Sequence, residues 1–585
     1  MKTLIKNIFA ILPLLFIASC DLTLIPEDTV TPSAYFKSET DLQLWTNQFY
    51  SILDTPDNAG GVNADDMVDK TMGEVISGTR LASEDIDGAN EWNWKLLRKV
   101  NYLLQNSSNC SDLSVRQHYE GVAYFFRAYL YYQKVMRFGD LPWYNQVLKS
   151  TDEELLKKPR EDREIVMDSI MVDFDRAIKM LPSTKDVARV TKWTALAMKS
   201  RVALFEGTWR KYRGLSDADK FLTSAAEAAR TFIDESGYTL YSEGPTPYRD
   251  LFNSDDAKST EIILARIYNF ETLNLSHGVQ FNIRNGAQGF TRRFMNHYLM
   301  ADGTRYTDKA GHDTLFYTEE VKNRDPRMVQ TVLCPGYIIK DGKSVTPNDM
   351  TSMTGYEPIK YVSTEAHSGA SKGTSDFSII RAAEVYLNYA EAKAELGTLT
   401  QEDINVSVNK IRTRAKMPAL DLATSNASPD AFLLSCYPNV TKSANTGVIL
   451  EIRRERTVEM VMEGLRMWDM FRWKEGAQMV NSVNPYTGIY FPSEGLYDMD
   501  GDGKNDLEIY SKTQKSSAAD GLTVKKIGTD LILTGGTKGY VVAWSNLSYT
   551  WDETRDYLWP IPANQRVLTG GILSQNPGWT DSTNL

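Results

Sequence analysis

The clearest chemical signal in the sequence is a set of closely spaced carboxylates in the segment 498–506 (DMDGDGKND). Its carboxylates, its glycine and one backbone carbonyl match positions 1, 3, 5, 6, 7 and 9 of a calcium-binding loop. The ligands would come from Asp498, Asp500, Asp502, Lys504 (by its carbonyl) and Asp506. Position 12 is Ile509, which cannot ligate, so a complete EF-hand is excluded. We therefore predict a Ca²⁺ ion that orders a surface loop, and a solvated acidic turn is the alternative.

The N-terminus carries a second chemical signal, a cysteine placed for lipidation. Two lysines precede an apolar stretch, 8–17, which is followed by Ala18-Ser19-Cys20. Roughly 10 apolar residues are too few to cross a bilayer, which takes roughly 20, so residues 1–19 are predicted to be a removed signal peptide. Small residues before a cysteine resemble a lipobox, in which the thiol of Cys20 receives a diacylglycerol and anchors the chain. The alternative is an ordinary signal peptide with a cysteine at its edge by chance.

Other reactive residues are scattered. The sequence contains no HExxH, GxSxG or GxxxxGK[ST] motif, which are the usual marks of zinc proteases, serine hydrolases and P-loop enzymes. A glycosidase needs only two carboxylates roughly 5–9 Å apart, and no linear motif reveals such a pair. Cys110, Cys334 and Cys436 allow at most one disulfide, and neither they nor the five histidines form a zinc motif. The net charge of −11, without a basic cluster, argues against a nucleic-acid partner.

Helical periodicity dominates two parts of the chain and predicts a mainly α fold. The first group of predicted helices is Leu42–Leu53, Trp94–Leu104, Tyr119–Val135, Arg163–Leu181, Lys192–Phe205 and Lys220–Ile233. The second group is Ile379–Leu396, Gln401–Lys416, Val448–Met462 and Leu465–Arg472. Small residues let two helices approach closely, so we expect tetratricopeptide-like helix pairs, although the strict repeat consensus is absent.

The stretches outside these helices are rich in Gly, Asn, Thr and Tyr, which predicts long irregular loops and a few short strands. We therefore divide the mature chain into an N-terminal helical region (20–236), a loop-rich ligand-binding region (237–378) and a C-terminal region (379–585). The last of these has a loop-rich insertion at about 485–550. Thr400 and Asp403 form the T-x-x-D pattern of a capping box.

Several motifs resemble the SusD/RagB family of nutrient-binding lipoproteins, in the same order along nearly the whole chain. They are Pro26-Glu27-Asp28, Ala34-Tyr35-Phe36, Asn47-Gln48-Phe49-Tyr50, Phe126-Arg127-Ala128, 138–142 (FGDLP), 380–392 (IRAAEVYLNYAEA), 409–415 (NKIRTRA), the run of Glu455-Arg456, Glu459, Glu463-Gly464, Arg466, Asp469 and Arg472-Trp473, Pro560-Ile561-Pro562, and 575–579 (QNPGW). One departure is Phe138, where the family usually has Tyr. The resemblance implies a SusD-like fold of helix pairs.

The resemblance also implies a function without catalysis. A family member would sit on the extracellular face of the outer membrane, anchored by its lipid, and would capture a glycan. It would act as a lid over a SusC-like TonB-dependent transporter and pass the glycan on for import. Two alternatives stay open at this point, which are a surface glycan-cleaving enzyme and the same fold with a peptide as ligand.

Sugar binding needs flat aromatic faces flanked by polar groups, and twelve Trp make such faces available. Trp92 is our first candidate, because Trp94 matches a packing position of the family. The other candidate glycan-binding residues are Arg80, Asp66, Phe290 and Tyr298. For each of them, a structural role in the core is the commoner alternative.

The charged residues of the run 455–469 recur mostly at three- and four-residue spacings, which makes them neighbours on a helix surface. A catalytic carboxylate pair is one interpretation. We favour a partly buried salt-bridge network that fixes this helix pair to the C-terminal segment, because structural ion pairs are far commoner than catalytic ones.

Overall fold

The computed structural model describes residues 35–56, 59, 61–82, 92–480, 484–517 and 521–581. The predicted signal peptide and Cys20 lie outside these residues. Within the described ranges, no helix combines the length and the apolar character needed to cross a membrane.

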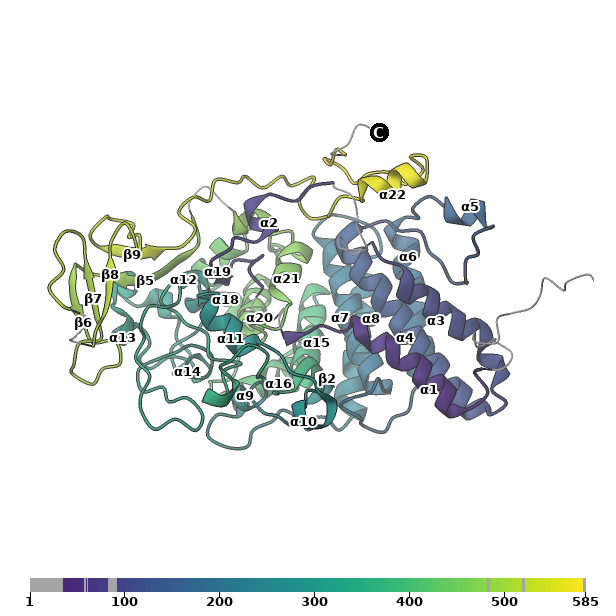
Figure 1. Ribbon diagram of the computed structural model, residues 1–585, viewed down its shortest axis with the longest axis horizontal. Coiled ribbons are helices and arrows are strands. Elements are labelled where there is room, and N and C mark those ends of the chain that lie inside the picture. The colour runs from purple at the N-terminus through teal and green to yellow at the C-terminus, as the bar shows by residue number, and fades with distance from the viewer. Residues whose placement is uncertain are drawn as a thin grey trace, which may run out of the picture.

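Long helices of the N-terminal region form one side of the molecule (Figure 1). They are α1 (Glu39–Asn47), α3 (Lys95–Asn106), α4 (Leu113–Phe138), α6 (Arg163–Met180), α7 (Lys192–Lys211) and α8 (Ala218–Glu235). Helix α4 packs on α6, and α7 packs on α8. Close approach in the second pair depends on Gly207, where an added Cβ would lie 2.7 Å from the side chain of Leu222. The predicted scaffold of helix pairs is confirmed.

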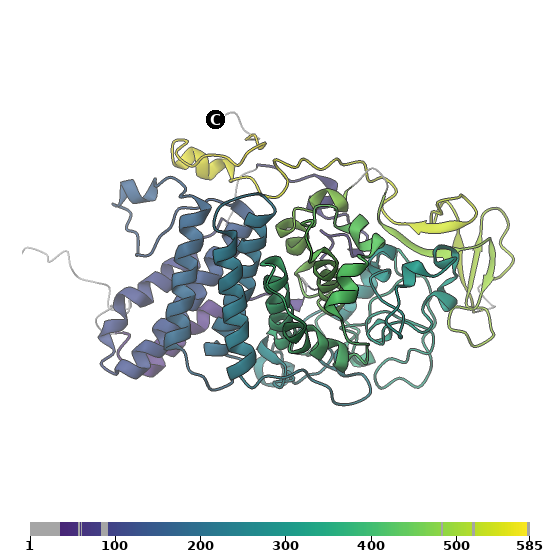
Figure 2. The same ribbon diagram turned by 180° about the vertical axis from the view of Figure 1, so that it is seen from behind.

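The second helical group packs against α8 through α15 (Ala382–Glu395) (Figure 2). It continues with α16 (Gln401–Asn405), α17 (Val408–Arg414), α20 (Thr446–Glu459) and α21 (Arg466–Arg472). The capping box of Thr400 and Asp403 is confirmed. The prediction that a helix starts at Ile379 was wrong, because strand β4 (Phe377–Arg381) pairs with β2 (Ile262–Arg266) and the helix begins only after it.

The region 237–378 is irregular, as predicted, and contains only short elements. Besides β2, it holds β3 (Gly289–Phe290), which pairs with β1 (Met67–Val68) from the N-terminal region. The remaining short α-helices within the described residues are α2 (Glu74–Ser77), α5 (Glu153–Leu156), α9 (Pro247–Asp250), α10 (Phe270–Leu273), α11 (Val279–Asn285), α12 (Arg292–Met295), α13 (Tyr317–Glu320), α14 (Met328–Thr331), α18 (Leu422–Ala427), α19 (Ala431–Cys436) and α22 (Ala563–Leu568).

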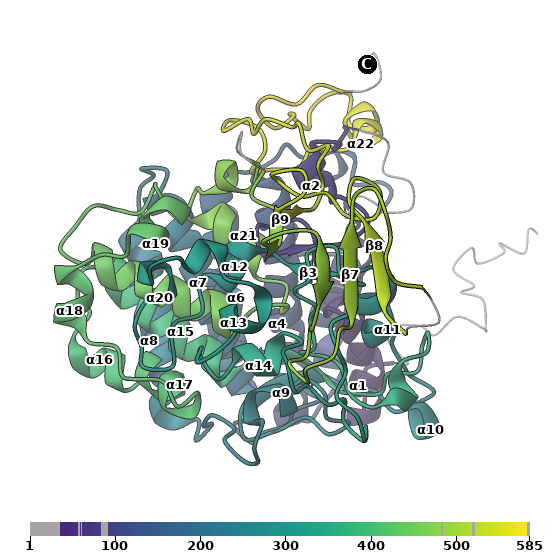
Figure 3. The ribbon, with the colours of Figure 1, turned by 90° about the vertical axis from the view of Figure 1, so that its left-hand side faces the viewer.

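The predicted insertion at about 485–550 forms two small sheets at the end of the molecule farthest from α1 (Figures 1 and 3). Strand β5 (Thr487–Phe491) pairs with β9 (Gly539–Val542). Strand β7 (Leu507–Tyr510) lies between β6 (Gly495–Tyr497) and β8 (Thr523–Lys526). Part of the backbone N–H and C=O groups of this segment therefore form hydrogen bonds between short strands.

The charged run 455–469 forms a buried ion-pair network, which confirms the structural interpretation. Glu459 is fully buried and accepts from Arg381 at 2.7 Å, from Arg327 at 3.0 Å and from Arg414. Burial alone would raise the pKa of the Glu459 carboxyl, but these guanidiniums outweigh it and hold the pKa well below its usual range. Its partners lie in β4, α17 and the middle region, so the prediction of a link to the C-terminal segment was wrong.

The three cysteines of the described chain are buried free thiols, so none of them forms a disulfide. Burial raises the pKa of Cys334 to about 12 and that of Cys436 to about 11. Both are therefore protonated and unreactive at neutral pH.

Candidate functional site

A cavity of about 730 Å³, which we call the central cleft, lies where the N-terminal helices meet the middle region and α21. This volume falls within the range of about 300–1,000 Å³ that small-molecule sites usually have. Residues from six parts of the chain line it, among them Asp66, Tyr132, Arg201, Gln288, Ser378 and Trp468. The cleft is thus a place where segments far apart in sequence converge.

Three buried polar atoms in the wall of the central cleft have no hydrogen-bond partner in the protein. They are Oδ1 of Asp66, Oε1 of Gln288 and Oγ of Ser378. These residues are only 5%, 9% and 6% exposed. Buried polar atoms are nearly always paired, because an unpaired one costs about 1–3 kcal/mol. These three oxygens therefore remain available for hydrogen bonds with the polar groups of a ligand.

The short β1–β3 pair positions the two acidic residues beside the cleft. The carbonyl of Asp66 accepts from the Thr291 N–H at 2.9 Å, and the Thr291 hydroxyl donates to the carbonyl of Asp65 at 2.7 Å. These bonds fix the backbone just before β1. Asp65 and Asp66 lie in the bend that leads into β1.

Asp65 forms an ion pair, whereas within the described residues no ion pair is formed by Asp66, whose Oδ1 lacks a hydrogen-bond partner. Arg466 holds Asp65 with two hydrogen bonds of 2.7 and 2.9 Å. Burial opposes ionisation of Asp65, but the Arg466 charge outweighs it and lowers the pKa to about 2. Burial, and then the neighbouring Asp65 charge, raise the pKa of Asp66 to about 7. A carboxyl group perturbed in this way within a cavity is typical of functional sites.

Aromatic side chains give the cleft an apolar surface beside its polar atoms. Tyr129 and Tyr132 of α4 line it and are almost fully buried. Trp468 of α21 is half-buried, with its ring 5.7 Å from Phe471 and 5.7 Å from Trp559, measured between ring centroids. A supported and partly exposed indole can stack on the C–H face of a pyranose ring.

The structure separates the predicted glycan-binding residues. Asp66 lines the central cleft. Phe290 and Tyr298 are 0% exposed, so they have no face to offer a sugar and those two predictions were wrong. The prediction for Arg80 was also wrong, because this residue is buried. Its Cζ lies 4.7 Å from the ring centroid of Trp559 and 5.4 Å from that of Trp579, and its guanidinium pairs with the Asp556 carboxylate at 3.2 Å.

Trp92 lines a different cavity of about 610 Å³, which we call the tryptophan cleft. Its ring is 5% exposed and packs edge-on against Trp94 and Phe138. Trp94 is the more exposed of the two and lines the same cavity, which reverses the roles that the sequence suggested. The structure thus brings neither Trp92 nor Arg80 together with Asp66 in the central cleft.

Sequence reasoning missed Gln288, Ser378 and Trp468. Trp468 could have been predicted, because it is an aromatic residue within a run of charged residues that pair with each other, as Asp469 does with Arg456 and Arg472. Gln288 and Ser378 carried none. Each is a polar residue beside or within a short strand, and only the folded chain shows that its oxygen lacks a partner.

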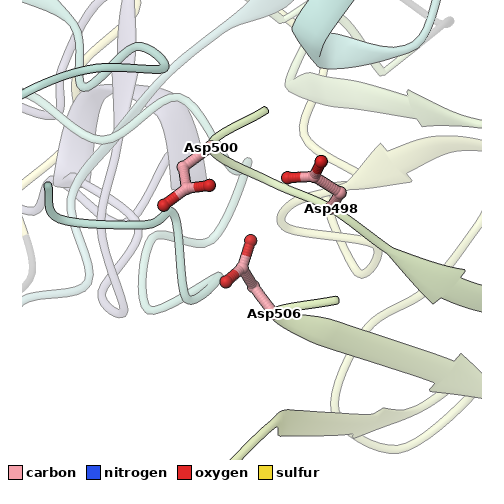
Figure 4. A group of neighbouring side chains, drawn as sticks. All are labelled: Asp498, Asp500 and Asp506. Carbon is pink, nitrogen blue, oxygen red and sulfur yellow. The ribbon is translucent and has the colours of Figure 1, made fainter. Parts of the chain in front are cut away.

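The acidic loop joins β6 to β7 and gathers three of its four carboxylates (Figure 4). One oxygen each from Asp498, Asp500 and Asp506 lie within 4.8 Å of one another. Burial and then the other carboxylates raise the pKa of Asp500. Asp502 lies apart from the group and pairs with the ammonium of Lys504 at 3.0 Å. The geometry is thus compatible with the predicted ligands Asp498, Asp500 and Asp506.

Two family profiles match the chain. The first, described as "SusD family", matches residues 275–579, and the second, described as "Starch-binding associating with outer membrane", matches residues 63–204. The second match supports an association of the chain with the outer membrane.

Known proteins agree with these profiles. SusD-like protein P38 of Formosa agariphila is 22% identical over 508 residues, which cover 80% of this chain and 91% of that protein. A SusD-like protein from Bacteroides fragilis has a similar crystal structure, with a TM-score of 0.67 and 21% identity over 93% of this chain and 98% of the other. A SusD-like carbohydrate-binding protein from the same species gives a TM-score of 0.66 and 20% identity over 91% and 98%.

These comparisons support the mainly helical SusD-like fold, and the family is one of binding proteins and not of enzymes. The first profile spans more than half of the 585 residues. The chain belongs to the SusD family.

Proposed function

We propose that the chain is a glycan-binding protein whose ligand enters the central cleft. The observation that carries the proposal is the set of three unpaired buried oxygens of Asp66, Gln288 and Ser378, all of residues that line this one cavity. Sugar hydroxyls can donate to all three, and the Trp468 indole lies in the same cavity for stacking. The neighbour described as carbohydrate-binding supports the same ligand class.

Affinity gel electrophoresis tests this proposal with starch, laminarin, xylan, mannan and pectic galactan in the gel. We expect at least one polymer to retard the protein. The variants Asp66→Asn and Gln288→Leu should lose roughly 10- to 100-fold in affinity, since a hydrogen bond to a charged or buried group contributes about 1.5–3 kcal/mol. Gln565→Leu in the tryptophan cleft is the matched control and should bind normally. Retardation that is equal in all variants would refute the central cleft as the site.

We propose that Cys20 carries the lipid and that the protein lies on the extracellular face of the outer membrane. The support is the apolar stretch and small residues before Cys20, together with the outer-membrane association of the matched profile. Labelled palmitate should be incorporated by the wild-type chain but not by Cys20→Ala. Protease added to intact cells should degrade the wild-type protein, and full protection would place it on the inner face.

We also propose that the protein passes its glycan to a SusC-like TonB-dependent transporter. The support is membership of the SusD family. Affinity purification of the full-length chain from detergent-solubilised outer membranes should recover a TonB-dependent transporter. Recovery of the chain alone, under mild detergent and across several detergents, would count against a stable complex.

Calcium is proposed for the acidic loop, held by Asp498, Asp500 and Asp506. The support is the sequence pattern and the convergence of these three side chains. Calcium would offset the repulsion between the carboxylates and order the connection between β6 and β7. Titration calorimetry on chelator-treated protein should show one site with Ca²⁺, and no heat above the dilution control would refute it.

A further inference from the structure

The charges around the central cleft restrict the kind of glycan that fits it. Four of the guanidiniums in its wall are already held by buried carboxylates. Arg201 pairs with Glu384 at 2.6 Å, and Arg466 pairs with Asp65 at 2.7 Å. Arg456 pairs with Asp469 at 2.8 Å, and Arg472 makes a hydrogen bond of 2.7 Å to Glu391. A ligand carboxylate or sulfate would therefore meet cations whose charge a protein carboxylate already offsets.

The fifth guanidinium in the wall is also engaged. Arg137 lies over the ring of Trp559, with its Cζ 4.8 Å from the ring centroid. No lysine is among the described residues that line the cleft. All five guanidiniums of the wall thus have a partner within the protein, and an anionic group of a ligand would have to compete with that partner.

The unpaired atoms of the wall point to the same conclusion. Oδ1 of Asp66 and Oε1 of Gln288 can accept hydrogen bonds, but apart from protonated Asp66 they cannot donate. A ligand carboxylate or sulfate is likewise acceptor-only, so it would face Oε1 of Gln288 and ionised Asp66 without a hydrogen bond, and ionised Asp66 would also repel it. A sugar hydroxyl can donate to each acceptor and accept from the Ser378 hydroxyl.

We infer that the central cleft selects an uncharged glycan and rejects uronic-acid and sulfated sugars at the units that enter it. This inference rests on the proposed function, since it describes the ligand of the same cleft. The proposed function concerns the site of glycan binding, and the inference concerns the charge of the glycan. A cleft that binds glycans through Asp66 and Gln288 could still prefer acidic ones.

Matched polymers provide the test. The full chain is titrated with a neutral polysaccharide that retards it in the affinity gels. The same titration uses that polymer after oxidation of C6 hydroxymethyl groups to carboxylates, and after chemical sulfation. Polygalacturonate and its carboxyl-reduced neutral form make a second pair. We expect the neutral member of each pair that binds to exceed its charged partner in affinity by at least tenfold. Its affinity should change less than twofold between 50 and 500 mM NaCl, because no ion pair forms with the ligand.

The variants separate this inference from the proposed function. Stronger binding of an acidic or sulfated polymer that is lost in Asp66→Asn and Gln288→Leu would overturn the inference and leave the proposed glycan site standing. Binding of a neutral polymer that is unchanged in both variants would overturn the proposed site and the inference with it. Stronger neutral binding that is lost in both variants, but kept in Gln565→Leu, supports both.

Discussion

Two adjacent aspartates are predicted to respond in opposite ways to the same substitution. Asp65 and Asp66 are both buried, but only Asp65 has a cationic partner. Replacing Asp65 with Asn would leave Arg466 buried without its bidentate carboxylate, which costs about 3–5 kcal/mol. Replacing Asp66 with Asn removes a carboxyl group that has no such partner. We therefore expect Asp65→Asn to destabilise the protein and Asp66→Asn to stabilise it at alkaline pH.

The pKa of Asp66 sets the magnitude. Its pKa is about 7 in the folded protein against 3.8 for the ordinary side chain, a rise of roughly 3 units. Each unit corresponds to 1.36 kcal/mol, so ionised Asp66 lowers the free energy of unfolding by about 4 kcal/mol at pH 8. Because the folded state binds this proton more tightly, the penalty is absent below pH 4 or so. It grows as the pH rises to about 7.

The Asp65 contribution has the opposite sign. Its pKa is lowered from 3.8 to about 2, so its ionised form stabilises the folded state above the ordinary pKa. That stability, of about 2 kcal/mol, is lost as the pH falls from about 4 to about 2.

Urea unfolding of both variants and the wild type at pH 5, 6, 7 and 8 measures these effects. The difference between Asp66→Asn and wild type should grow in favour of the variant from pH 5 to pH 8. Asp65→Asn is the matched control and should be less stable than wild type throughout. If Asp66→Asn were destabilised at pH 8 to the same degree, Asp66 would be an ordinary paired carboxylate and the argument for a ligand site would lose its main support.

Three further predictions concern the ion network, the cleft and the acidic loop. Glu459→Gln should lower the free energy of unfolding by about 3–5 kcal/mol in the same urea assay, because it leaves buried guanidiniums uncompensated. The control Asp168→Asn breaks the exposed pair with Lys220 and should change the free energy of unfolding by less than about 1 kcal/mol. Trp468→Ala should weaken glycan binding about tenfold in calorimetry with little loss of stability, since its ring is half-buried, and an unchanged affinity would remove the stacking role. Adding Ca²⁺ should raise the melting temperature of chelator-treated wild type but not of Asp498→Asn, and an equal rise in both would place the ion elsewhere.

The long helices could be predicted from sequence because their apolar periodicity extends over many turns. Lys192–Phe205 and Lys220–Ile233 both lie within the observed α7 and α8. The predicted helix start at Ile379 was wrong because a strand leads directly into a helix there. A short apolar run has the same sequence pattern in a buried strand as in a buried helix.

The central cleft could be predicted only in part, because its walls come from segments far apart in the chain. Asp66 was among the residues predicted from sequence, whereas Phe290 and Tyr298 were misassigned because sequence does not tell a buried aromatic ring from an exposed one. The two-residue strands β1 and β3 are too short for any periodic signal, yet their pairing fixes the backbone beside Asp66 and Gln288.

A crystal structure of the protein with a retained neutral oligosaccharide would show which cavity holds the glycan and which atoms contact it. We expect sugar hydroxyls within about 3.2 Å of Oδ1 of Asp66 and Oε1 of Gln288, the hydrogen-bond range. We also expect a pyranose face on the Trp468 ring. An oligosaccharide bound only in the tryptophan cleft, with Asp66 and Gln288 untouched, would contradict these expectations.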